Sequence, residues 1–285
     1  MSAEVISGRE VAQALRQEMK EEVNKMQAAG LNPHLTVILV GEDPASQSYV
    51  RGKEKAASEI GISSQVIRME EDTSEASLLT EIQKLNQDPS VHGILVQLPL
   101  PKHIDEQKVI ESIDPKKDVD GSHPVNVGKM MLNQDTFLPC TPHGILKMLQ
   151  SKAIELEGKH AVIIGRSNIV GKPMGQLLLN ADATVTYCHS RTKNLREITK
   201  QADILIVAVG KAHFIDGSYL KEGAAVIDVG VNRIDDGSLT GDVEFDSAKK
   251  VASYITPVPG GVGPMTITML LANTLKAAER LSSLA

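Results

Sequence analysis

Apolar and polar positions alternate along the first half of the chain in a strand–helix rhythm. Residues 35–40 are almost all apolar, as in a strand buried on both faces. A polar segment with helical character follows over 46–60. The same succession returns as strand, helix and strand at 65–69, 74–86 and 93–98. Strands that alternate with helices predict βαβ units and a parallel sheet.

A second run of the same kind begins near His160, after an interruption rich in proline and charged residues. A long helix is expected from the segment after Pro264 to about Leu281, and another from Ser7, which suits a capping box, to Gly30. With 285 residues, the chain has the length of about two domains. The strands of the second run are expected at 161–165, 184–189, 204–209, 225–230 and 253–256.

Composition excludes several classes of protein. The net charge of −6 comes without a basic block, so we expect no nucleic-acid or membrane-surface partner. No apolar run reaches the ~20 residues that span a bilayer, and the N-terminus does not resemble a secretory signal. The two cysteines, Cys140 and Cys188, are too few for a disulfide framework. We therefore expect a cytoplasmic globular protein.

A glycine-rich turn follows the first strand of the second run. Gly165 ends the strand and Gly171 opens the next helix. Glycine allows close approach of the backbone, and a helix N-terminus carries partial positive charge that suits a pyrophosphate. Five residues separate these glycines, which departs from the usual dinucleotide fingerprint. On this feature alone, an ordinary strand–helix connection is an equal alternative.

The end of the next strand favours NADP over NAD. NAD-binding folds place Asp or Glu there, about 20 residues after the turn, to hold the ribose 2′-hydroxyl. Here Ser190 and Arg191 follow the strand, and Arg166 lies in the turn. A hydroxyl and two guanidinium groups suit a 2′-phosphate, although solvated surface arginines are the alternative.

Tyr49 and Lys53 lie four residues apart, on one face of the predicted helix. Such a pair is most often an ordinary helix surface. In short-chain dehydrogenases a Tyr-x-x-x-Lys pair follows the nucleotide turn, whereas here it precedes the turn by more than 100 residues. That order excludes the short-chain class.

Six stretches give the chain a resemblance to a known family. In order and approximate spacing they are similar to those of the bifunctional methylenetetrahydrofolate dehydrogenase/methenyltetrahydrofolate cyclohydrolases, along essentially the whole chain. Six coinciding stretches are far more specific than any one of them, and none departs at the catalytic positions. They are Ser46–Lys53, Gly93–Pro101, Lys117–Gly121, Pro139–Pro142, Gly165–Pro173 and Pro257–Thr268.

The resemblance implies the fold class and the domains. It implies a two-domain α/β protein: an N-terminal α/β domain with a parallel sheet, a C-terminal Rossmann-type NADP-binding domain, and an active site in the cleft between them. The C-terminal helix is expected to return to the first domain. The folate-binding domain would then hold residues 1–120 plus 267–285, and the Rossmann-type domain 121–266. A homodimer is also implied.

The resemblance further implies the roles of individual residues. Lys53 would be the central catalytic residue, with Gln97 hydrogen-bonded to it, and Tyr49 would stack on the aminobenzoyl ring of the folate. Asp120 would hold the pterin, although Asp-Gly is also a common turn pair. Further substrate contacts would be Pro259, Gly260 and Gly261. The cofactor contacts would be Gly165, Arg166, Ser167, Ser190 and Val231. Arg191 is added because its guanidinium suits a 2′-phosphate.

The chemistry suits so sparse a site. Hydride removal from the methylene carbon leaves a delocalised cation and releases no proton, so orientation is the main requirement. Hydrolysis of the methenyl cation calls for proton transfer near neutrality. A partly desolvated lysine beside a cationic substrate has a lowered pKa, and Gln97 can orient it without fixing its charge. We therefore expect Lys53 to serve mainly the cyclohydrolase step and Asp120 mainly folate binding.

The remaining residues leave two alternative functions open. The histidines show no metal-ligand spacing, so no metal is expected. Cys140 precedes a predicted helix N-terminus, which would lower its pKa, but an incidental thiol is the simpler account. Another two-domain NADP dehydrogenase, of the shikimate dehydrogenase kind, is the main alternative enzyme. A catalytically silent folate- or NADP-binding protein is the alternative outside enzymes.

Overall fold

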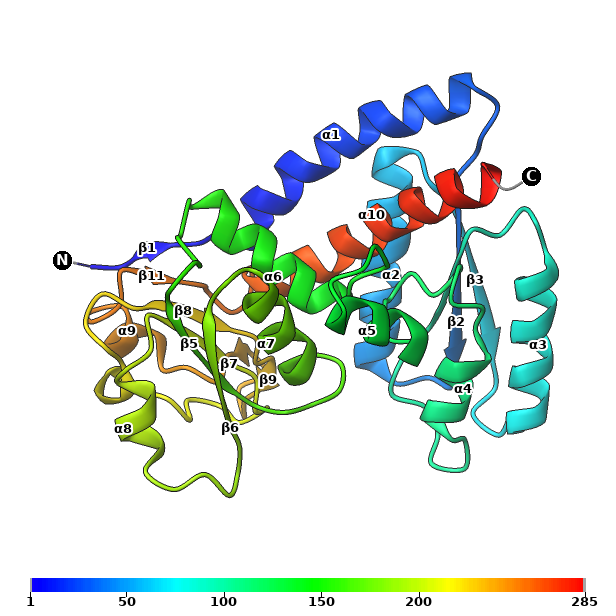
Figure 1. Cartoon of the computed structure of the whole chain (residues 1–285). Helices are drawn as coiled ribbons and strands as arrows, with labels where there is room; N and C mark the ends of the chain where they lie inside the picture. Colours follow the sequence, from blue (N-terminus) through cyan, green and yellow to red (C-terminus); the bar gives the residue numbers. More distant parts are fainter. Residues whose placement is uncertain (1, 284–285) are drawn as a thin grey trace. The chain divides into compact units, whose positions relative to one another are not determined.

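The computed structural model describes residues 2–283, which form two compact units (Figure 1). The three-stranded unit comprises Ala14–Cys140 and the residues from Ile267 onward, and the six-stranded unit comprises the residues up to Gln13 and Thr141–Thr266. The expected class of two α/β domains with parallel sheets is confirmed.

Two segments lie in a different unit from the one expected. The residues up to Gln13 belong to the six-stranded unit, because β1 (Glu4–Val5) pairs there with β11 (Tyr254–Ile255). Residues 121–140 belong to the three-stranded unit, where the backbone N–H of Cys140 donates to the carbonyl of Asp120 at 3.1 Å.

The three-stranded unit is built on a parallel sheet in the order β3-β2-β4. The central strand β2 (His34–Val40) is almost wholly buried and pairs with β3 (Ser63–Met69) and β4 (Gly93–Val96), with Val37 opposite Val66 and Leu95. The five elements predicted for this region, three strands and two helices, are therefore confirmed to within a few residues. Its helices include α2 (Pro44–Ile60), α3 (Glu75–Gln87), α4 (Glu106–Ser112) and α5 (Pro124–Met131).

Local sequence explains where α2 begins and ends. Asp43 caps the first turn by accepting from the backbone N–H of Ser46 at 2.7 Å, and Pro44 occupies the first helical position. Gly61 closes the helix in the left-handed region with φ 88°. Both ends of the helix that carries Lys53 are therefore fixed by local contacts.

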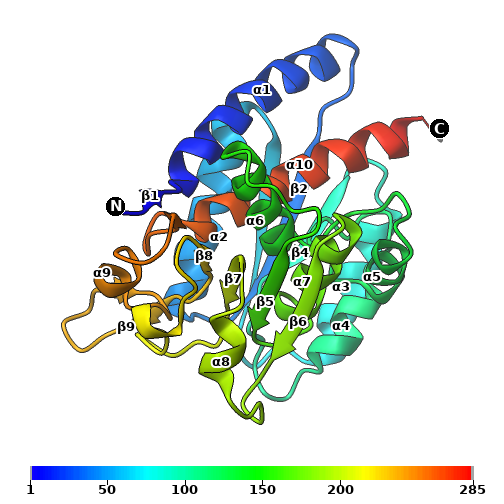
Figure 2. The ribbon, with the colours of Figure 1, turned by 60° about the vertical axis from the view of Figure 1, so that its left-hand side comes forward.

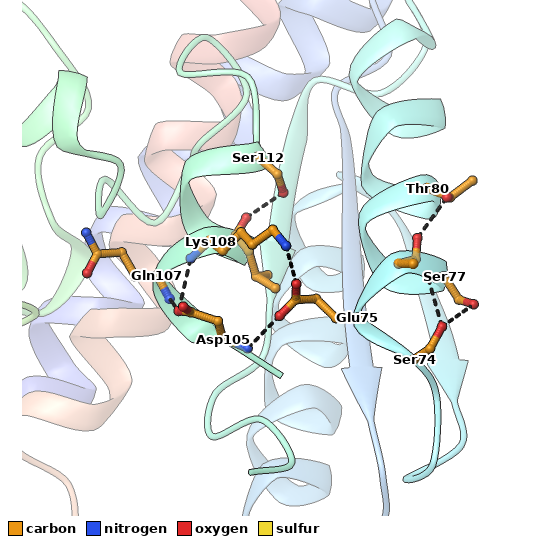
Figure 3. Close-up of polar contacts among 10 residues, drawn as sticks. Ser74, Glu75, Ser77, Thr80, Asp105, Gln107, Lys108 and Ser112 are labelled. Carbon is orange, nitrogen blue, oxygen red and sulfur yellow. Dashed lines mark hydrogen bonds and ion pairs between the residues drawn. The ribbon is translucent and has the colours of Figure 1, made fainter. Parts of the chain in front are cut away.

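Polar caps join α3 to α4 (Figure 3). Ser74 caps α3, and Asp105 caps α4 by accepting from two backbone N–H groups. Glu75 receives both the Lys108 ammonium and the backbone N–H of Asp105. At the other end Asn86 accepts from the backbone N–H of Asp114 at 2.9 Å. These contacts fix the start of the loop that carries Asp120.

The six-stranded unit holds a parallel sheet in the order β1-β11-β8-β7-β5-β6. The succession β8, β7, β5, β6 can be followed in Figure 2. The predicted strands of the second run are confirmed at β5–β8 and β11, whereas β1 was not expected, since two residues carry too little pattern to be recognised. Apolar residues of these strands form one core cluster. The remaining bounds are β5 (His160–Ile164), β6 (Thr184–Cys188), β7 (Ile204–Val207), β8 (Ala225–Asp228), and a two-stranded hairpin of β9 (Asn232–Arg233) and β10 (Leu239–Thr240).

Two long helices complete the chain, α1 (Gly8–Ala28) and α10 (Val262–Ser282), and each has residues in both units. Ser7 accepts from the backbone N–H of Glu10 at 3.3 Å, as the capping pattern predicted. Of the helices within residues 2–283, none combines the length and hydropathy that a membrane crossing requires. The shorter helices are α6 (Cys140–Ser151), α7 (Gly171–Asn180), α8 (Leu195–Thr199) and α9 (Phe245–Ala248).

Candidate active site

Lys53 and Gln97 form a direct contact in the three-stranded unit. Lys53 lies on the inner face of α2 and is 8% exposed, and its Nζ donates to Gln97 Oε1 at 2.7 Å. Gln97 follows the last residue of β4, and its backbone N–H donates to the carbonyl of Ile38 at 2.9 Å. Its amide nitrogen donates to the carbonyl of Leu98 at 2.6 Å. The sheet therefore fixes the amide with its oxygen toward the lysine.

Burial and one nearby carboxylate act in opposite directions on the pKa of Lys53. Burial lowers the pKa of the Lys53 ammonium, and the nearby Asp120 carboxylate offsets part of that shift. Burial also raises the pKa of the Asp120 carboxyl, which the Lys53 charge partly opposes. The amine is thereby brought closer to the range in which a general acid or base works near neutrality.

Buried side chains hold the loop of Asp120 from one side. Asp118 is 1% exposed and accepts from the backbone N–H of His123 and from Asn126 Nδ2, both at 2.8 Å. The Asn126 oxygen in turn accepts from the Thr136 hydroxyl at 2.7 Å. This closed network makes Asp118 a structural neighbour of Asp120 and fixes the loop.

Cys140 and Asn273 hold the same loop from the other side. The Cys140 thiol donates to the carbonyl of Val119, directly before Asp120, at 3.3 Å. Asn273, on α10, donates to the carbonyls of Val119 at 2.8 Å and Leu138 at 3.0 Å. Sequence reasoning missed both contacts, because the three segments are joined only in the fold.

Two sequence expectations about Cys140 are corrected. The helix α6 begins at Cys140, so this residue is the first of the helix and does not precede it. Burial raises the pKa of the Cys140 thiol well above its ordinary value, and this outweighs any effect of the helix N-terminus. The thiol therefore stays protonated, which agrees with assigning it no nucleophilic role.

Ser46 is a further polar group on the inner face of α2, two turns before Lys53. Its hydroxyl is buried and has no hydrogen-bond partner within the described part of the chain, residues 2–283. Tyr49, one turn before Lys53, is 40% exposed. The spacing Ser46, Tyr49, Lys53 is the sequence signal that could have revealed the serine.

The expected cofactor residues gather at the carboxyl edge of the six-stranded sheet. Gly165 follows β5 with φ 132°, and a Cβ there would overlap the carbonyl oxygen of Ala208 after β7. Ser167 Oγ accepts from the backbone N–H groups of Val170, directly before α7, and of Gly171, its first residue, both at 3.2 Å. This close-packed glycine turn at a helix N-terminus fits a pyrophosphate. It follows β5, which lies between β7 and β6 in the sheet, and ligands of such sheets bind where the strand order reverses.

The groups expected to recognise a 2′-phosphate lie beside this turn. Residues Gly165 and His189 directly follow the paired residues Ile164 and Cys188 of β5 and β6. Arg166, Ser190 and Arg191 are all exposed there. Val231, after β8, is 49% exposed. All of these residues belong to one unit and none is engaged in an ion pair among residues 2–283.

Pro259, Gly260 and Gly261 belong to the six-stranded unit, whereas Tyr49 and Asp120 belong to the three-stranded unit. Gly260 has φ 100°, and its carbonyl accepts from the backbone N–H of Arg9 at 3.2 Å. A Cβ on Gly8 would overlap the carbonyl oxygen of Gly261, so this turn packs tightly on the start of α1. No cluster of three His, Cys, Asp or Glu side chains that could hold a metal ion occurs in residues 2–283.

The models of one protein family match most of the chain. The family described as tetrahydrofolate dehydrogenase/cyclohydrolase matches with its catalytic domain over residues 6–120 and its NAD(P)-binding domain over 139–282. A bifunctional protein FolD from Oceanobacillus iheyensis is 67% identical over 280 residues, which cover 98% of each chain.

Solved structures give the same result. The bifunctional FolD enzyme from Campylobacter jejuni has 51% identity and a TM-score of 0.96, over 98% of this chain and 99% of that chain. The Trypanosoma brucei enzyme, solved with NADP and an inhibitor, has 41% identity and a TM-score of 0.96 over 100% of both chains. Shikimate dehydrogenase from Aquifex aeolicus shares the fold alone, at 13% identity and a TM-score of 0.51, over 87% of this chain and 97% of that chain.

These matches confirm the predicted class of a dehydrogenase/cyclohydrolase enzyme with an NAD(P)-binding domain, and they set the shikimate dehydrogenase alternative aside. The chain belongs to the tetrahydrofolate dehydrogenase/cyclohydrolase family.

Proposed function

We propose that the chain uses NADP to oxidise 5,10-methylenetetrahydrofolate to 5,10-methenyltetrahydrofolate, and then hydrolyses the product to 10-formyltetrahydrofolate. The observation that carries this proposal is the buried contact of Lys53 with Gln97, beside Asp120. It provides an amine with a lowered pKa in a chain whose other unit is an NAD(P)-binding domain.

The oxidation places few demands on side chains. NADP, when bound, supplies the hydride acceptor. The methylene carbon between N5 and N10 loses a hydride and becomes a cation delocalised over both nitrogens, and no proton leaves in this step. The residues of the site therefore orient the folate, and the rate depends on that geometry.

Folate orientation is assigned to Tyr49 and Asp120. The exposed phenol ring of Tyr49 offers a face on which the aminobenzoyl ring stacks. The Asp120 carboxylate offers two acceptor oxygens to the amino and ring N–H groups of the pterin. Pro259, Gly260 and Gly261 contribute a rigid turn to the folate contacts.

The hydrolysis is assigned to Lys53. Water adds to the methenyl carbon and loses a proton. One C–N bond then breaks as the departing nitrogen gains a proton, and the hydroxyl loses its proton to solvent as the formyl C=O forms. An amine with a lowered pKa can take up the first proton and supply the second. Gln97, which is neutral, holds Lys53 at 2.7 Å without fixing its charge.

The cofactor site is assigned to the glycine turn and the residues beside it. The backbone at Gly165 and the turn held by the Ser167 hydroxyl suit the pyrophosphate. Ser190, Arg191 and Arg166 suit the 2′-phosphate that distinguishes NADP from NAD. Val231 contributes an apolar contact. The absence of an acidic residue at the end of β6 supports NADP as the preferred cofactor.

Two further properties are part of the proposal. The chain works as a homodimer and in the cytoplasm. The homodimer is implied by the resemblance to the family, and the cytoplasm is the expectation from the composition. Size-exclusion chromatography with light scattering and fractionation of the source cells test them.

Turnover of 5,10-methylenetetrahydrofolate by the purified chain tests the main proposal. Reduced cofactor and the methenyl species are followed together by absorbance, first with NADP and then with NAD. Reduction of NADP with little accumulation of methenyl species is expected. Persistent methenyl species contradicts the cyclohydrolase, and no reduction with either cofactor contradicts the dehydrogenase.

A further inference from the structure

Two buried carboxylates lie at the carboxyl edge of the six-stranded sheet, and no step above uses them. Asp228 is the last residue of β8 and is 3% exposed, and Asp242 lies two residues after β10 and is 0% exposed. None of the ion pairs within residues 2–283 includes either carboxylate. Their hydrogen bonds therefore go to neutral groups, mainly the backbone.

Asp242 holds the loop that follows β7. Its carboxylate accepts from three successive backbone N–H groups, those of Val209 at 2.6 Å, Gly210 at 2.9 Å and Lys211 at 2.8 Å. It also accepts from Asn232 Nδ2 at 2.9 Å. The three backbone donors fix the path of this loop, and the Asn232 amide fills a fourth acceptor position of the carboxylate.

Asp228 closes the segment 229–241, which follows β8 and contains the β9–β10 hairpin. Its carboxylate accepts from the backbone N–H of Gly230 and of Asp242 at 2.9 Å, and from that of Val243 at 2.8 Å. Both ends of the segment are thus tied to one side chain. Val231, an expected cofactor contact, directly follows one of the tied residues.

Glycines make room for both carboxylates. A Cβ on Gly230 would overlap the Asp242 carboxylate, and a Cβ on Gly241 would overlap the Asp228 carboxylate. Each glycine is close to an aspartate in sequence, in Asp228-Val-Gly230 and in Gly241-Asp242. The close packing shows that the two carboxylates are built into this edge of the sheet.

The loops held in this way border the dinucleotide turn. The carbonyl of Ala208, directly before the first N–H bound by Asp242, lies where a Cβ of Gly165 would be. The β7 loop thus packs on the turn that suits the pyrophosphate. Burial of two carboxylates without a cation is unfavourable unless their hydrogen bonds are complete. Here those bonds are directed to the backbone of the loops after β7 and β8.

We propose that Asp242 and Asp228 are positioning residues for the cofactor: through backbone N–H groups they fix the loops after β7 and β8 in the form that binds NADP. This inference rests on the proposed function. Neither carboxylate touches the cofactor. Their removal acts on the dehydrogenase step, which uses NADP, and leaves the cyclohydrolase step of the three-stranded unit, which does not.

The test compares two activities of one protein. Asp242→Asn keeps the size of the side chain but replaces an acceptor oxygen with an NH2 group that faces backbone N–H donors. The KM for NADP is expected to rise about tenfold or more, with a lower dehydrogenase kcat. Hydrolysis of 5,10-methenyltetrahydrofolate, measured without nucleotide, stays within about twofold of wild type. Asp235→Asn, an exposed residue of the same segment, is the matched control and leaves both activities unchanged.

A milder variant covers the case in which Asp242→Asn does not fold. Asn232→Ala removes only one side-chain donor from Asp242, so the KM for NADP is expected to rise a fewfold with hydrolysis intact. Unchanged NADP kinetics in a folded Asp242→Asn, or equal loss of both activities in Asn232→Ala, overturns the inference. A wild-type chain without dehydrogenase activity contradicts the proposed function instead, so the two failures are distinguishable.

Discussion

The Lys53 ammonium donates to the amide oxygen of Gln97 at 2.7 Å, across 44 residues of sequence. The partner is neutral, so it directs the amine without stabilising its charged form as a carboxylate would. Burial is then free to lower the pKa of Lys53, and the nearby Asp120 limits how far it falls. This balance is the basis of the first two predictions.

Gln97→Glu is expected to shift the pH dependence of hydrolysis. A carboxylate at this position raises the pKa of Lys53, so the neutral amine forms only at higher pH. The acid limb of the cyclohydrolase pH profile should move up by about 1–2 units. Gln65→Glu, at an exposed position, is the control. An acid limb that stays in place would show that Lys53 is not the group that titrates.

Asp120→Asn is expected to weaken folate binding far more than NADP binding. The KM for the folate should rise about tenfold, because a hydrogen bond to a charged group is lost. The same change removes the charge that raises the pKa of Lys53, so the acid limb of hydrolysis should move to lower pH. Steady-state kinetics at several pH values measure both effects. Equal weakening of folate and NADP points to a folding defect, which Asp72→Asn, an exposed control, should not share.

Arg191→Ala is expected to reduce the preference for NADP. Loss of one guanidinium from the 2′-phosphate should raise the KM for NADP about tenfold and leave that for NAD unchanged. Lys193→Ala removes a neighbouring exposed charge and serves as the control. If both cofactors are affected alike, Arg191 does not recognise the 2′-phosphate.

Asp228 is expected to make stability depend on pH. Burial, with Asp242 beside it, raises the pKa of Asp228 from 3.8 to about 6. Between these values the folded chain binds the proton more tightly than the unfolded chain, so the free energy of unfolding falls as the pH rises from about 4 to 6. A shift of this size corresponds to about 3 kcal/mol. Urea unfolding of wild type and Asp228→Asn at pH 4.5 and 6.5 should show a smaller fall in the variant, and equal falls would contradict the prediction.

The strand–helix rhythm predicted both parallel sheets, because a continuous apolar run such as 35–40 is typical of a strand buried on both faces. It could not predict β1, which is two residues long and is defined by its pairing with β11. Nor could it assign the residues up to Gln13 to the six-stranded unit, since that depends on the same pairing.

The candidate site was predictable where a motif carried it. Three of the six stretches that resemble the family contain Lys53, Gln97 and Asp120. The resemblance therefore predicted that these residues belong to one site. Asn273 and the pair Asp228 and Asp242 carry no such motif role, and their partners are backbone groups of distant segments. Cys140 shows the opposite failure, because a local effect at a helix N-terminus was outweighed by burial.

Single-turnover oxidation of 5,10-methylenetetrahydrofolate by wild type and Lys53→Met tests the central claim most directly. Lys55→Met on the same helix, whose side chain is 80% exposed, is the control. Folate binding should survive in Lys53→Met, while hydrolysis of the methenyl species falls by about 10²-fold or more, so that this species accumulates as NADPH forms. Hydrolysis at the wild-type rate in Lys53→Met would contradict the account.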